Sequence, residues 1–129
     1  MIRSIAAVAW MLCGAAQACG GPSDTVVEGK SYTVAYRTAP APIAMGEHFA
    51  LEVVVCPRDK AQLPRSLRVD AGMPEHKHGM NYRPTVTPRG GGRYRVEGML
   101  FHMSGRWEIA FDLAGAAGTE RITSSMVLE

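Results

Sequence analysis

The sequence predicts an all-β protein, an antiparallel β-sandwich of six to eight short strands that follows an N-terminal signal peptide. Three observations support this prediction. Beyond residue 18, apolar and polar residues alternate with a period of two, the alternating runs are short, and segments rich in glycine and proline separate them. The chain has 129 residues, 47% of them hydrophobic, which is the size of one ordinary domain.

The first eighteen residues differ from the rest of the chain. Arg3 precedes an apolar run that is too short to cross a bilayer, and Ala16-Gln17-Ala18 has the small residues of a cleavage site. We therefore expect a signal peptide over residues 1–18, an N-terminal tail over residues 19–30 and the sandwich over residues 31–129. The protein is then exported, to the periplasm or outside the cell.

Each alternating run predicts one strand with a single buried face, which includes Leu100 in the run 93–100 and Trp107 in the run 106–113. Residues 93–100 and 106–113 form the strongest local unit, which we interpret as a hairpin that turns at Ser104-Gly105. Residues 81–88 contain two prolines and predict an edge strand. Strands of this number and spacing are typical of an immunoglobulin-like sandwich. The other predicted strands are residues 31–37, 48–56, 66–71 and 120–128.

The cysteines indicate a disulfide bond. Cys13 lies inside the predicted signal peptide, so the exported protein retains Cys19 and Cys56, an even number in an oxidising compartment. The alternative is that Cys19 carries a lipid, because a cysteine directly after a small-residue cleavage site is similar to the start of a bacterial lipoprotein. The protein would then be a membrane-anchored lipoprotein.

The stretch MPEHKHGM concentrates potential metal ligands. In an extended backbone, His76, His78 and Met80 lie on the same side, and Met73 precedes them. In a strand, donors two residues apart are separated by about 6 to 7 Å, so the segment must bend before they can share an ion. Gly79 supplies the freedom for that bend.

His102 and Met103 form a second candidate pair at the end of a predicted strand. The alternative for His102 is a half-buried histidine that hydrogen-bonds to the backbone. We expect Met99 and Met126 to be core residues, because methionine is a flexible filler of cores. Met45 and His48 are expected in a loop. The candidate ligands are therefore His76, His78, Met80, Met73, His102 and Met103.

Copper is the metal that these ligand types favour. Thioether sulfur suits Cu(I), imidazole suits copper, zinc and nickel, and no cluster of carboxylates favours calcium or magnesium. Glu75 is a candidate to orient one imidazole by hydrogen bonding to it. The alternative is that Glu75 is a solvated charge in a loop. Methionine needs no deprotonation, so a His/Met site functions where a thiolate would be oxidised.

Other function classes lack support in the sequence. Fourteen basic and twelve acidic residues are scattered without blocks of like charge, which argues against nucleic-acid binding. No nucleophile elbow, phosphate-binding glycine loop, HExxH or CxxCH motif indicates an enzyme. Two hypotheses remain. The first is a copper-binding or copper-delivery protein. The second is a non-metal accessory domain that docks on a periplasmic or membrane protein partner through the rim of the sandwich that carries these His and Met residues.

Two segments, DAGMPEHKHGMNYRP and GGGRYRVEGMLFHMSGRWEIAFDL, resemble the YtkA-like and FixH-like group of small exported bacterial domains. Members of this group carry an MP-x-H-x-H-GM segment and a later M-x-G-x-W-E strand. The resemblance covers about residues 45 to 128 and implies an immunoglobulin-like sandwich and, for several relatives, copper handling or the assembly of respiratory oxidases. The matching positions are Met73, Pro74, His76, His78, Gly79, Met80, Met103, Gly105, Trp107 and Glu108.

Overall fold

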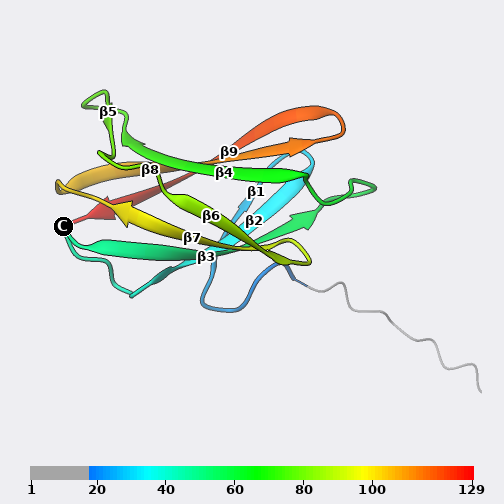
Figure 1. Cartoon of the computed structure of the whole chain (residues 1–129), viewed down its shortest axis with the longest axis horizontal. Helices are drawn as coiled ribbons and strands as arrows, with labels where there is room; N and C mark the ends of the chain where they lie inside the picture. Colours follow the sequence, from blue (N-terminus) through cyan, green and yellow to red (C-terminus); the bar gives the residue numbers. More distant parts are fainter. Residues whose placement is uncertain (1–17) are drawn as a thin grey trace, which may run out of the picture.

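The computed structural model describes residues 18–129, and these fold into two packed antiparallel sheets without a helix (Figure 1). One sheet has five strands in the order β1-β2-β3-β7-β6, and the other has four in the order β5-β4-β8-β9. The predicted all-β sandwich is thus confirmed, with nine strands in this part of the chain instead of six to eight. The predicted signal peptide lies, apart from Ala18, outside the described residues.

The strand bounds follow the predicted runs closely. No helix in the described segment is long and apolar enough to span a bilayer. The strands are β1 (Thr25–Glu28), β2 (Tyr32–Ala39), β3 (His48–Pro57), β4 (Ser66–Met73), β5 (His78–Gly79), β6 (Thr85–Gly90), β7 (Arg93–Leu100), β8 (Gly105–Gly115) and β9 (Gly118–Leu128).

The core lies between the two sheets and is formed by the inward-facing residues of the alternating strands. Trp107, Phe101 and Phe111 are its largest fully buried side chains. One buried hydrogen bond of 2.6 Å joins the hydroxyls of Tyr36 and Ser124, so these two polar groups, one from each sheet, satisfy each other across the core. The remaining core residues include Val34, Leu51, Val53, Val55, Leu67, Val69, Val96, Ile109 and Leu113.

The predicted hairpin of residues 93–113 is wrong, because β7 and β8 belong to different sheets. Residues 101–104 instead cross from one sheet to the other. Gly98 has a φ of 86°, and the pairing of β3 with β7 shifts register between Phe49 and Leu51. This irregularity turns Met99 and Phe101 into the core in place of Leu100, so the period-two pattern assigned the wrong face to the end of β7.

The N-terminal segment and the edge strand complete the first sheet. Part of the tail expected at residues 19–30 forms β1, which pairs with β2 from Thr25↔Tyr36 to Glu28↔Thr33. The short, mostly exposed run of β1 gave no alternation from which to predict it. The predicted edge strand is confirmed as β6, which contains Pro88 and pairs only with β7.

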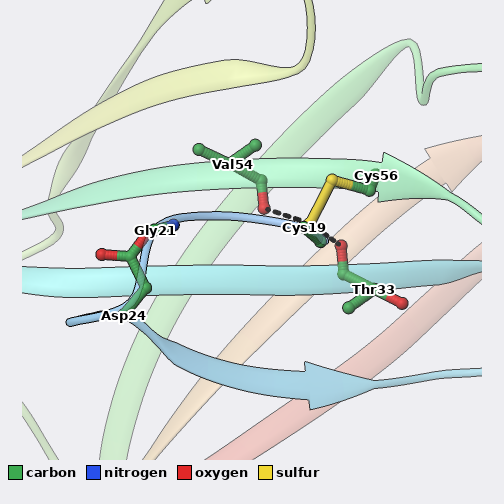
Figure 2. The surroundings of a disulfide bond; sticks show 6 residues. All are labelled: Cys19, Gly21, Asp24, Thr33, Val54 and Cys56. Carbon is green, nitrogen blue, oxygen red and sulfur yellow. Dashed lines mark hydrogen bonds between the residues drawn. A yellow bond between two sulfur atoms is a disulfide. The ribbon is translucent and has the colours of Figure 1, made fainter. Parts of the chain in front are cut away.

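The predicted disulfide joins Cys19 to Cys56, whose Cα atoms are 5.9 Å apart (Figure 2). Cys56 is near the end of β3, and Cys19 lies over β2 and β3, with its sulfur 3.6 Å from the carbonyl oxygen of Thr33. The bond therefore fixes the start of the described chain to the five-stranded sheet. This is the end of β3 opposite to His48.

Candidate metal centre

Three connecting segments meet at one end of the sandwich, and the candidate ligands lie in two of these segments or at the adjoining ends of β4 and β5. The three segments are the link between the sheets at residues 101–104, the turn between β4 and β5 at residues 74–77, and the loop between β2 and β3 at residues 40–47. The N–H of Gly46 donates a 2.8 Å hydrogen bond to the carbonyl of Phe101, which joins two of them. We call the set of His76, His78, His102, Met73, Met80 and Met103 the His/Met cluster.

The turn after β4 places His78 above Met73. These two residues are paired in an antiparallel register, so their side chains lie on the same face of the sheet. Met73 is buried, whereas His78 is exposed at the edge. The expected extended segment is corrected here: residues 74–77 form a tight turn, Lys77 has a φ of 52°, and the N–H of His76 donates to the carbonyl of Met73 at 3.1 Å. The bend therefore occurs at Lys77 and not at Gly79.

The turn brings three imidazoles into a row. Ring centroids are 6.1 Å apart for His76 and His78, and 5.2 Å apart for His78 and His102. An imidazole nitrogen lies about 2 Å from a bound metal, so two rings that share one ion have centres no more than about 6 Å apart. The pair His78 and His102 lies inside this limit, and His76 is at its edge.

His102 is held in place with an unsatisfied nitrogen. Its side chain is half-buried, and its Nδ1 atom is buried with no hydrogen-bond partner among the described residues. The alternative expected from sequence, a histidine bonded to the backbone, therefore does not hold for this nitrogen. A buried polar atom without a partner destabilises the fold by about 1 to 3 kcal/mol, so such atoms are rare without a functional reason.

Trp107 forms the wall against which the imidazoles rest. Its ring stacks on Phe101 at 4.3 Å, contacts His102 edge-on at 5.5 Å and lies parallel to His78 at 6.4 Å. The indole N–H donates a 2.9 Å hydrogen bond to the carbonyl of Met103, which fixes the link between the sheets. The alternation predicted Trp107 as a core residue, but no sequence signal placed it beside the histidines.

The thioethers lie on the core side of the cluster. Met73 is 1% exposed, and its methyl group reaches Gly105: a Cβ atom built on this glycine would lie only 2.7 Å from Met73 Cε. Gly105 also has a φ of 126°, which glycine adopts readily. Met80 and Met103 are half-buried and pack against the core. Met73, which pairs with His78, thus places one thioether on the core side of an imidazole.

Glu75 does not orient an imidazole. Its carboxylate accepts a 2.9 Å hydrogen bond from Nε of Arg106 on β8, so it ties the β4–β5 turn to the neighbouring strand. The Glu75 side chain is 60% exposed and that of Arg106 is 36% exposed, and pairs that water reaches in this way contribute about 0 to 1 kcal/mol. The pair positions the turn that carries His76 and His78.

The remaining candidates lie outside the cluster. His48, which was expected in a loop, is the first residue of β3, where it pairs with Leu100 of β7; it is exposed, and its ring lies 5.6 Å from that of Tyr82. Met99 is fully buried and Met126 half-buried against the core, as predicted. Among residues 18–129, no three side chains of His, Cys, Asp or Glu are grouped as a metal site. A metal centre here therefore depends on thioether sulfur in addition to imidazole.

The sequence matches the YtkA-like family over residues 27–112, which is more than half of the chain and includes the whole β4–β5 turn. No curated protein and no solved structure showed a significant match.

Proposed function

The chain belongs to the YtkA-like family, and we propose that this member of it is an exported copper-binding or copper-delivery protein that holds the ion at the His/Met cluster. The observation that carries this proposal is the unpartnered Nδ1 of His102, on a ring 5.2 Å from that of His78. A metal ion shared by the two imidazoles supplies the missing partner.

The donor set fits copper in its reduced state. His78 and His102 would provide nitrogen, and Met73 or Met103, which lie toward the core, would provide sulfur. Soft thioether ligands select Cu(I), and methionine keeps its affinity without losing a proton. The bound ion would rest beside the indole face of Trp107, which shields one side of the site from water.

Exposure of part of the cluster fits delivery as well as storage. His76 and His78 are exposed on a turn, while His102 and Met73 are held more deeply. A partner protein could displace the outer imidazoles by ligand exchange while the inner ligands still hold the ion. Exposed Met45 and Tyr82 lie in neighbouring loops and offer contact surface for such a partner.

The disulfide supports export to an oxidising compartment, the periplasm or the outside of the cell. It also favours the bridged form of Cys19 over a lipid anchor, since the sulfur of a disulfide has no thiol left for a lipid thioether. Intact mass and free-thiol counting on protein from the periplasm test this: the bridged form has no free thiol and no added lipid mass.

The direct test is competition for Cu(I) with a chromophoric chelator. Wild-type protein should bind one equivalent of Cu(I). The double variant His78→Ala/His102→Ala should lower the affinity at least about 100-fold, because the loss of a residue that only hydrogen-bonds to a metal ligand already costs 10- to 100-fold. His48→Ala is the matched control, because this histidine is near the same end but outside the cluster.

The outcome against copper is equally clear. If wild type and the double variant bind copper with the same weak affinity, the metal function is wrong. The alternative function, docking on a partner protein without a metal, is then favoured. In that case Tyr82→Ala, which removes an exposed aromatic side chain at this end of the sandwich, should weaken the binding of the partner.

A further inference from the structure

β4 of one sheet and β6 of the other contact each other at one side of the sandwich (Figure 1). A groove lies between them. It consists of two hollows of about 470 and about 420 Å³ that share Leu67 and Val86 in their lining. Leu67 is buried and Val86 is half-buried. We call it the β4–β6 groove; it is separate from the His/Met cluster.

The edge of β4 that borders this groove offers free backbone groups. β4 has only β5 as its neighbour on this edge, and that pairing covers Gly72 and Met73 alone. The carbonyl of Ala71 accepts a hydrogen bond from Met80 at this edge, so alternation directs the N–H and C=O groups of Val69 and Leu67 the same way. No described strand pairs with them there.

The two edges of the groove differ in their protection. Pro84 precedes β6 and Pro88 lies within it, and proline blocks the addition of a further strand because it has no N–H. β4 contains no proline. An added strand would therefore pair with β4 and lie against the apolar lining of the groove.

The charge of the groove selects the added strand. Arg65, Arg83 and Arg93 line it, are exposed, and make no ion pair with any described residue. Arg121, in contrast, is bound in bidentate fashion by Asp112. Arg68 and Asp70 also line the first hollow and make no ion pair with a described residue. The unpaired charges are therefore Arg68, Arg83 and Asp70 in one hollow and Arg65 and Arg93 in the other, so the uncompensated charge of each hollow is positive.

We propose that the β4–β6 groove binds an extended acidic segment of another protein, which adds as a strand to the free edge of β4. Backbone hydrogen bonds to Leu67 and Val69 supply the geometry, and the arginines select carboxylate side chains. This goes beyond copper binding and does not depend on it, because the groove shares no residue with the His/Met cluster.

The test uses a synthetic peptide of about eight residues with alternating Glu and Val, the length of an ordinary strand. Calorimetry should detect binding that weakens with salt, and NMR should show slowed hydrogen exchange at the amides of Leu67 and Val69. Arg83→Glu should weaken the affinity at least about tenfold, as reversal of a charge in a complementary contact does. Lys30→Glu is the matched control, since it changes the net charge equally from an exposed position at the β1–β2 turn.

Three results would overturn the proposal. A peptide with Lys in place of Glu could bind equally well, or Lys30→Glu could weaken binding as much as Arg83→Glu. Binding to vesicles of anionic phospholipid, sensitive to Arg83→Glu and without any binding of the acidic peptide, would assign the groove to a membrane surface instead.

Discussion

The two ends of the sandwich are built in opposite ways, although β3 runs from one to the other. At one end Cys56, near the close of β3, is covalently joined to Cys19 (Figure 2). At the other end, beyond His48, turns carry exposed imidazoles, and the buried Nδ1 of His102 has no partner among the described residues. The first end holds the fold together, and the second keeps donor atoms free at a cost in stability.

Removing the disulfide should give the largest effect and should leave the other end intact. Cys19 and Cys56 are 37 residues apart, so the chain-entropy model predicts a loss of about 4 kcal/mol in the free energy of unfolding for Cys19→Ala with Cys56→Ala. Denaturant unfolding measures this loss. Cu(I) affinity of the folded variant should be unchanged; a parallel drop would show that the two ends are coupled.

His102→Leu should have the opposite pattern. Leucine removes the unsatisfied nitrogen, so we expect the metal-free protein to become more stable by about 1 kcal/mol. Copper binding should fall at least about tenfold, as expected when a ligand is lost. Thermal unfolding with and without Cu(I) measures both effects. A variant that is less stable without metal would mean that His102 is a structural residue.

Met73→Leu and Met99→Leu separate sulfur as a ligand from sulfur as packing. Both methionines are essentially fully buried, and a Met-to-Leu exchange usually costs less than about 1.5 kcal/mol. We therefore expect similar small losses of stability but a loss of Cu(I) affinity only for Met73→Leu. Chelator competition on the two variants decides this, and equal affinities would remove Met73 from the ligand set.

The smallest effect concerns the outer surface of the four-stranded sheet. The bidentate hydrogen bonds from Arg121 lower the pKa of Asp112 below its usual value of 3.8, against an opposing effect of burial. A carboxyl with a lowered pKa in the folded state stabilises the protein above its unfolded pKa, and this contribution disappears as the pH falls through the folded pKa. Asp112→Asn should therefore be slightly less stable at pH 7 and equal to wild type in strong acid. A pH series of unfolding measurements checks this.

The sequence predicted the faces of the strands well where the period of two was unbroken. β2, β3, β4 and β8 bury the residues expected of them, because one face of each strand meets the core. The prediction was wrong beyond Gly98, whose positive φ shifts the alternation by one position. An isolated glycine in a strand is compatible with a bulge, but whether the alternation shifts there depends on the pairing of β3 with β7, which the local sequence does not give.

The candidate cluster was predictable in its composition but not in its construction. The spacing of His76, His78 and Met80 indicated ligands on a rim, and the turn at Lys77 then brought the rings within reach. Neither the crossing of residues 101–104 between sheets nor the position of Trp107 beside His102 follows from periodicity, because both result from the packing of the two sheets.

X-ray absorption at the copper edge of protein loaded with one equivalent of Cu(I) tests the central claim most directly. We predict a shell of imidazole nitrogen and thioether sulfur in wild type, with the nitrogen contribution reduced in His102→Leu and the sulfur contribution reduced in Met73→Leu. A shell of oxygen and nitrogen alone, unchanged in both variants, would contradict a copper centre at this end of the sandwich.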